Sequence, residues 1–149
     1  MTESRPPGTA SMIEVRHATE AEAGWLFRQD DITAESVLRR VKQGEYILAL
    51  KDAEHAGFMR YSLFWSTIPY MEMIRVVPRL RRQGLGTAMH RFWEQEMRRQ
   101  DHKLLMTSSM KDEPPPQAWH RRNGYVTSGE LTFGRVQAVP EGFFVKDLA

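Results

Sequence analysis

The sequence predicts one mixed α/β domain, in which helices cover both faces of a central, mostly antiparallel sheet. Three observations predict it. The length of 149 residues suits one core rather than two. Short segments carry strand signals, the first of them with alternating apolar and polar residues, and segments with helical apolar spacing separate them. We expect the order β-α-α-β-β-β-α-β-α-β-β in a single domain over residues 12–149, after a flexible tail at residues 1–11.

The first half of the chain carries two helix signals and four strand signals. Residues 12–16 alternate apolar and polar side chains, which predicts a half-buried first strand. Thr19 and Glu22 form a capping-box pattern that opens one helix, and a second helix fits residues 33–43 before Gly44. Short connections make the next three strands antiparallel neighbours, at residues 46–50, 57–65 and 71–77.

The second half of the chain predicts a parallel crossover. A helix over residues 85–97 would carry the chain to a short buried strand at residues 104–107, in a right-handed βαβ unit. Three prolines, Pro114 to Pro116, can only begin a helix, which we expect over about residues 117–122 before Asn123-Gly124. The last two strands are expected near residues 131–136 and 143–146.

The composition excludes several classes of site. Without cysteine the chain has no disulfide, no thiolate metal site and no acyl-cysteine intermediate, and its histidines lack metal-ligand spacing. No window reaches the roughly 18 apolar residues of a membrane span, and no secretory segment is visible, so we expect a cytoplasmic protein without a membrane partner. A net charge of +2 is too small to predict a nucleic-acid partner. The arginine clusters keep a basic nucleic-acid-binding domain as a less favoured alternative.

The strongest functional signal is the segment Arg79-Leu80-Arg81-Arg82-Gln83-Gly84-Leu85-Gly86, which joins a strand to a helix. Glycines at 84 and 86 let the backbone approach a ligand, and the helix N-terminus favours an anion. Arg81 and Arg82 add donors that match phosphate oxygens. The Walker and dinucleotide patterns fit less well, because no lysine precedes Thr87 and a third glycine is missing. The plain alternative is a tight turn with solvated arginines.

This segment resembles the signature of the GNAT acetyltransferase superfamily. The family pattern is Gln or Arg, two residues, Gly, one residue, then Gly or Ala, and Arg81, Gly84 and Gly86 occupy those positions. A second family element, an aromatic pair followed by three residues, Gly and an aromatic, corresponds to residues 119–125. The resemblance covers about residues 12–148. It implies an N-acetyltransferase that moves an acetyl group from acetyl-CoA to a primary amine, by direct attack in a ternary complex.

The resemblance also implies where acetyl-CoA binds. Backbone amides of the loop would hold its pyrophosphate, and its pantetheine arm would pair with residues 74–76 as an added strand. The arm would fill a V-shaped gap between that strand and residues 104–107, where a backbone N–H near Val76 could polarise the thioester carbonyl. The expected cofactor-binding residues are Ile74, Val76, Arg81, Arg82, Gln83, Gly84, Leu85, Gly86 and Thr87.

Two residues are candidates for proton transfer. Glu72 would share the face of Ile74 and Val76 by strand alternation, so it could take the proton of the amine. A substrate-binding or merely solvated Glu72 is an equal alternative. His120 occupies the position of the tyrosine that usually protonates the departing thiolate in the family. It could act as the acid, bind a CoA phosphate with Arg121 and Arg122, or cap its helix.

The resemblance implies an acceptor site built from the first two helices, their loop, and the turn between strands three and four. Candidate substrate-binding residues are Trp25, Asp30, Phe64, Trp65, Tyr70 and Ser109. Aromatic faces beside acids suit a cationic amine, although Trp25 and Phe64 could simply fill the core. Ser108 is a further candidate for contact with the acceptor or the pantetheine arm. Because His120 is atypical, the main alternative is a catalytically silent acyl-CoA-binding module. An enzyme that transfers a different acyl group is a further alternative. The protein could also form a homodimer.

Overall fold

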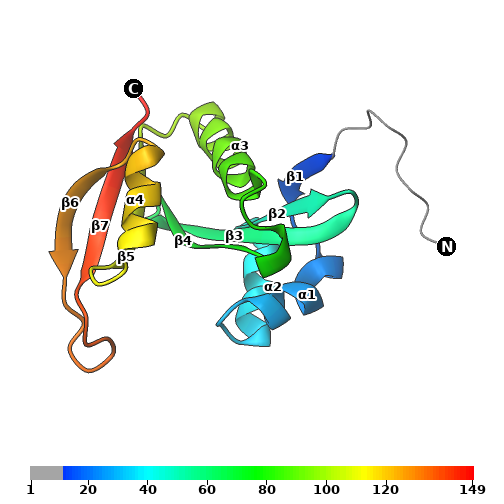
Figure 1. The fold of residues 1–149 in the computed structure, drawn as a ribbon, viewed down its shortest axis with the longest axis horizontal. Coiled ribbons are helices and arrows are strands. Elements are labelled where there is room, and N and C mark those ends of the chain that lie inside the picture. The colour runs from blue at the N-terminus through cyan, green and yellow to red at the C-terminus, as the bar shows by residue number, and fades with distance from the viewer. Residues whose placement is uncertain (1–11) are drawn as a thin grey trace.

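The computed structural model describes residues 12–149, so the tail expected at residues 1–11 lies outside the described range. Figure 1 shows the fold. The elements follow the predicted order: β1 (Ile13–His17), α1 (Ala23–Gln29), α2 (Ala34–Lys42), β2 (Tyr46–Lys51), β3 (Glu54–Phe64), β4 (Ile68–Val76), α3 (Leu85–Arg99), β5 (Leu104–Met110), α4 (Pro114–Arg122), β6 (Val126–Leu131) and β7 (Glu141–Asp147). Two 3₁₀ turns, Glu20–Glu22 and Pro78–Leu80, precede α1 and α3.

The seven strands form one sheet in the order β1-β2-β3-β4-β5-β7-β6. Every neighbouring pair is antiparallel except β4 and β5, which are parallel and joined through α3. The mixed, mostly antiparallel sheet is therefore confirmed. In Figure 1 the β1–β4 half and the β5–β7–β6 half run in clearly different directions.

The sheet divides where β4 meets β5. These two strands pair at only two positions, Tyr70 with Met106 and Met71 with Thr107. Beyond them β4 continues to Val76 and β5 to Met110 without pairing to each other. The V-shaped gap expected between these strands is thus present, and it opens toward the C-terminal end of β4.

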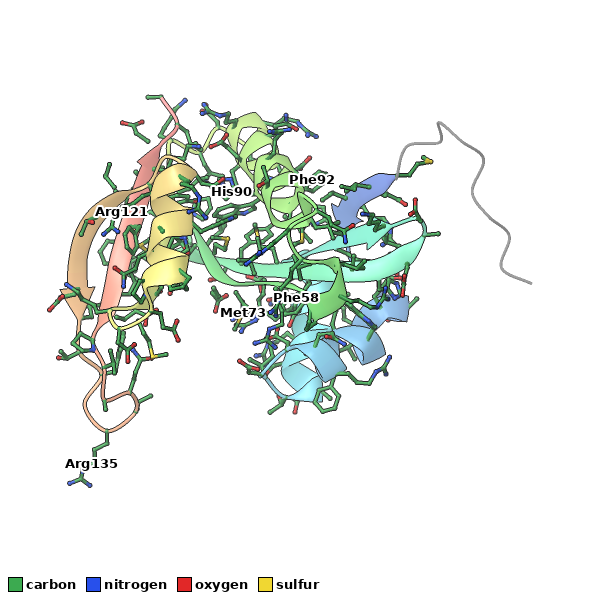
Figure 2. The ribbon with its side chains drawn as sticks, in the orientation of Figure 1. Phe58, Met73, His90, Phe92, Arg121 and Arg135 are labelled. Carbon is green, nitrogen blue, oxygen red and sulfur yellow. The ribbon has the colours of Figure 1, made fainter. Side chains whose placement is uncertain are left out.

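Helices cover the two faces of the sheet and make two cores. On one face α1 and α2 enclose Leu26, Val37 and Phe58. On the other face α3 contributes Met89 and Trp93 to a larger core, against which Trp119 of α4 packs. Figure 2 shows Phe58 and Met73 on the α1–α2 side of the sheet and His90 and Phe92 on α3. The split sheet is therefore held from both sides.

One strand prediction and one helix prediction need correction. Residues 131–136 do not form a strand, because β6 spans Val126–Leu131 and a loop follows it. Gly124, at a φ of +92°, turns the chain at the end of α4, and β6 starts two residues later. All residues of β6 are exposed, so no alternating burial marks this edge strand in the sequence. The fourth helix also begins at Pro114, earlier than about residue 117, because all three prolines fit its first turn.

A β-bulge lies in β4 beside the gap. Arg60 of β3 pairs with Met73, but the next residue, Tyr61, pairs with Met71, so Glu72 has no Cα partner. Such an extra residue breaks the alternation of side chains along the strand. Ile74 and Val76 pack toward the α3 core, whereas Glu72 reaches Arg40 of α2. The expectation that Glu72 shares their face is therefore wrong.

Candidate functional site

The predicted loop forms an uncapped helix N-terminus. Gly84 is the N-cap of α3 at a φ of +84°, a conformation that an L side chain rarely adopts. No side chain caps this end, and the first turn holds no acidic residue. Arg79 pairs with Glu54, whereas the ion pairs within residues 12–149 include none to Arg81 or Arg82. Arg81 donates from Nε to Val76 O at 3.1 Å, so the terminal nitrogens of Arg81 and Arg82 remain for an anion beside the free N–H groups of the helix.

Three adjoining hollows connect this loop to the gap in the sheet. The loop cleft is lined by Val76, Leu80, Arg81, Arg82, Gly84, Leu85, Gly86, Thr87, Trp119 and Arg122. The middle cleft shares Val76, Arg81, Gly86 and Trp119 with it and adds Ile74, Arg75, Pro115, Pro116 and His120. Of the expected cofactor residues only Gln83, which is exposed, lines neither cleft.

The inner cavity, of about 520 Å³, continues from the middle cleft and shares Ile74, Arg75, Pro116 and His120 with it. Both separated strands line it, with residues 71–75 of β4 and 107–110 of β5, together with Asp31, Glu113, Gln137 and Glu141. The three hollows therefore form one path, which begins at the α3 N-terminus, passes through the gap in the sheet and ends in the inner cavity, where several carboxylates lie.

Charge and hydrogen bonding distinguish the inner cavity from a packing defect. Four carboxylates line it, those of Asp31, Glu72, Glu113 and Glu141, against the single arginine Arg75. Ser109 and His120 also line it; both are buried, and the Ser109 hydroxyl and both His120 ring nitrogens lack hydrogen-bond partners among the described residues. Unsatisfied buried polar atoms are rare in proteins, and those that line a cavity can be satisfied by a bound ligand or by water.

The carboxylate of Glu72 is held by two arginines. Arg40 of α2 contacts both of its oxygens, with Nη2 to Oε1 at 3.0 Å, and Arg60 Nη1 lies 3.3 Å from Oε1. Arg60 in turn donates to both oxygens of Asp30, at 2.8 and 3.2 Å. This chain of charges ties α1 and α2 to the bulge of β4. Glu72 therefore lies beside the gap, as expected, but its charge is already compensated.

Four of the residues expected at an acceptor site lie outside the inner cavity. The Asp30 side chain has no exposed surface, since Arg60 and the Tyr46 hydroxyl bind it, so it cannot touch a substrate. Trp25 packs on His55 near the α1–α2 core. The Phe64 and Trp65 rings contact each other in a tilted arrangement at the exposed β3–β4 turn. None of these four residues lines the inner cavity, because the sequence gives their spacing along the chain but not the sheet face that they occupy.

The two remaining acceptor candidates, Tyr70 and Ser109, do lie at the gap. Ser109 lines the inner cavity. Tyr70 is one of the two residues of β4 that pair with β5, and its hydroxyl lies 2.6 Å from Ser108 Oγ. Ser108 donates to Glu141 Oε2 at 2.6 Å, and Gln137 Nε2 donates to Glu141 Oε1 at 3.1 Å. Glu141, Gln137 and Glu113 were missed, because no pattern along the chain indicates that β7 lies next to β5.

His120 lies where the middle cleft meets the inner cavity. Burial lowers its pKa from 6.5 to about 4, with a smaller contribution from the charge of Arg121 and an opposing one from the Ser108 backbone. His90 of α3 is buried nearby, bonded at 2.9 Å to Tyr125, and burial also lowers its pKa to about 4. Both imidazoles are therefore neutral at neutral pH.

Acid should destabilise the fold through these two histidines. The unfolded chain takes up the protons near pH 6.5 and the folded chain only near pH 4, so between these values unfolding is favoured. Each histidine should cost about 2 kcal/mol of unfolding free energy from pH 7.5 to pH 5. Urea denaturation at pH 7.5 and 5.0 measures the difference in unfolding free energy between these pH values. In His120→Phe this difference should be roughly half that of the unmodified protein, whereas in His102→Gln it should be unchanged. An unchanged pH dependence in His120→Phe would contradict this assignment.

Two other features of the described residues bear on the class of protein. Residues 12–149 contain no group of three or more histidine, aspartate or glutamate side chains placed to hold a metal ion. None of the helices in this part of the chain is long and apolar enough to cross a membrane.

Comparison with known families agrees with the loop and the split sheet. The model of the acetyltransferase (GNAT) family matches residues 11–125. The chain belongs to the GNAT acetyltransferase family. Acetyl-CoA is the co-substrate of this family, and the uncapped α3 N-terminus, the Arg81 and Arg82 side chains and the open space beside Gly84 fit its diphosphate. A search of curated protein sequences gives no match.

Solved structures show the same fold at low sequence identity. Ard1 from Thermoplasma volcanium aligns with a TM-score of 0.80 at 14% identity, over 92% of this chain and 98% of its own. A ribosomal-protein-alanine N-acetyltransferase from Brucella melitensis aligns at 0.75 and 20% identity, over 91% and 99%. The yncA structure from Salmonella typhimurium, which holds its cofactor acetyl-CoA, aligns at 0.75 and 12% identity, over 92% and 94%.

Proposed function

We propose that this GNAT protein transfers an acetyl group from acetyl-CoA to a primary amine that carries a positive charge before it reacts. The observation that carries the proposal is the continuous path from the loop cleft through the middle cleft to the inner cavity. A thioester donor bound along this path, with its diphosphate at the α3 N-terminus, would place its acyl group at the inner cavity, which is lined by carboxylates. An amine that enters the inner cavity meets that acyl group directly, so no covalent enzyme intermediate is needed.

The donor would be held by the residues that line the two clefts. Backbone amides from Gly84 to Thr87 and the Arg81 and Arg82 side chains would bind the diphosphate. Residues 74–76 of β4, which β5 leaves unpaired, would bind the pantetheine arm through backbone hydrogen bonds. The thioester supplies an electrophilic carbonyl carbon, which a backbone N–H near Val76 can polarise.

His120 would serve the departing sulfur as a neutral imidazole. Its pKa of about 4 makes the imidazolium scarce at neutral pH, so its contribution is a hydrogen bond from the ring N–H rather than a proton stored in advance. Its unpartnered ring nitrogens leave that N–H available.

The acceptor is proposed to be cationic because the inner cavity is acidic. Glu72 and Asp31 contact arginines, whereas the ion pairs within residues 12–149 leave Glu113 and Glu141 without a cation. Two uncompensated carboxylates favour an ammonium group. A small amine, an amino acid or a peptide N-terminus has this group. The ribosomal-protein-alanine N-acetyltransferase of the same fold is a reason to include peptide α-amines in any panel.

The test is thiol release from acetyl-CoA against polyamines, amino acids and short peptides, with calorimetry of CoA binding alongside. We expect turnover with at least one cationic amine and none with the same compound after N-acetylation, with a product heavier by one acetyl group in mass spectrometry. CoA binding without turnover across the panel would favour a silent acyl-CoA-binding module. Absence of CoA binding would overturn the proposal.

A further inference from the structure

The carboxylate of Glu141 differs from that of Glu72 in what binds it. Glu72 contacts two guanidinium groups, and accepting a proton would remove the charge that both of them balance. Among residues 12–149, the groups that donate hydrogen bonds to the Glu141 carboxylate are neutral: the Ser108 hydroxyl and the Gln137 amide. Ion pairs within residues 12–149 include none to Glu141. It lines the inner cavity, so it is available to an amine there.

The hydrogen bonds around Glu141 have a fixed direction. A carboxylate only accepts, so the single hydroxyl hydrogen of Ser108 points to Glu141 Oε2. Tyr70 must then donate its own hydroxyl hydrogen to Ser108 Oγ across 2.6 Å. The Tyr70 ring stacks on Phe143, two residues along β7 from Glu141, with ring centroids 6.2 Å apart. Tyr70, Ser108 and Gln137 thus set the position of one carboxylate at the place where β4 and β5 separate.

We propose that Glu141 is the proton acceptor for the amine, and that Tyr70, Ser108 and Gln137 are its positioning residues. This inference rests on the proposed N-acetyl transfer. The bound ammonium gives one proton to Glu141, which later passes it to solvent. The nitrogen then forms a bond to the thioester carbonyl carbon and the carbon–sulfur bond breaks. The second proton of the nitrogen ends on the departing sulfur, so the products are the N-acetyl amine and the free thiol.

The experiment compares Glu141→Gln with Glu72→Gln, using the amine that turns over best with the unmodified protein. Glutamine keeps the shape of the side chain but takes up no proton, so kcat for Glu141→Gln should fall about 100-fold at pH 7. Its remaining activity should rise with pH as the amine loses its proton in solution. CoA affinity, measured by calorimetry, should not change. Glu130→Gln, an exposed carboxylate on β6 paired with Lys111, is the matched control and should keep full activity.

The positioning residues need a readout beyond a slower rate. Ser108→Ala should lower kcat about 10-fold and displace the acid limb of the pH profile, and Ser108→Thr should restore both because it keeps the hydroxyl. An unchanged kcat and pH profile in Glu141→Gln would overturn the inference. So would a result in which Glu72→Gln, and not Glu141→Gln, abolishes the pH dependence of kcat. Failure of the proposed function is a separate result, because the unmodified protein would then show no turnover with any amine.

Discussion

Gly86→Leu should lower the affinity for coenzyme A at least about 100-fold, which corresponds to roughly 2.7 kcal/mol of binding free energy. A Cβ at this position would lie 3.8 Å from Trp119 Cζ2, so a larger side chain extends into the space that the loop cleft and the middle cleft share. A diphosphate must approach the α3 N-terminus through that space. Isothermal calorimetry with coenzyme A measures the loss.

The same substitution should not weaken the fold. Gly86 lies in the first turn of α3 at a φ outside the left-handed region, and leucine favours helix over glycine by about 0.8 kcal/mol. The free energy of unfolding in urea should therefore be unchanged or higher. Gly24→Leu in α1 is a matched glycine-to-leucine change in an exposed helix position away from the clefts, and it should bind coenzyme A normally. If Gly86→Leu binds coenzyme A with unchanged affinity, the loop around Gly86 is not part of the donor-binding site.

Arg60→Ala should destabilise the fold by about 3–5 kcal/mol, the usual cost of leaving a buried charge without its partner. The Asp30 side chain has no exposed surface, and Arg60 makes two of its hydrogen bonds. Burial alone would raise the pKa of Asp30, but the hydrogen bonds from Arg60 and Tyr46 hold it below its ordinary value. The stabilisation is therefore complete at neutral pH and is lost as pH falls below about 3.8. Urea denaturation at pH 7.5 gives the unfolding free energy.

Two further variants separate charge from packing. Arg79→Ala removes an exposed pair with Glu54 and should cost at most about 1 kcal/mol. The double variant Asp30→Leu, Arg60→Met replaces the buried pair by apolar groups of similar size and should recover most of the loss. An Arg60→Ala variant no less stable than Arg79→Ala would show that the network from Asp30 to Glu72 does not hold α1 and α2 to the sheet.

This network also explains why the α1–α2 region contributes little to the inner cavity. Arg40 and Arg60 neutralise Glu72 from one side, and Arg75 lies 3.6 Å from Asp31. The carboxylates left for a cationic ligand come from the segment before α4 and from the start of β7, at Glu113 and Glu141. The acidic end of the groove is therefore formed by the C-terminal half of the sheet.

The sequence by itself determined the parts of this protein whose physical causes are local. The capping box of Thr19 and Glu22, the prolines that start α4 and the strand-loop-helix segment around Gly84 depend on residues a few positions apart. Family membership and the donor co-substrate follow from that loop. Short apolar runs between turn residues placed most of β2 to β4 correctly, because helices bury both faces of β2 and of the middle of β3.

Only the tertiary structure shows which residues form the part of the cavity where the amine is proposed to bind. The bulge at Glu72 arises from the register between β3 and β4, and it turns this side chain away from the sheet face of Ile74 and Val76 and toward Arg40, 32 positions earlier. Glu141 reaches Ser108, 33 positions before it, because β7 enters the sheet between β5 and β6. Periodicity along a chain carries no information on which strand lies next to which. The donor loop could therefore be predicted from the sequence, whereas the carboxylate proposed to accept the proton could not.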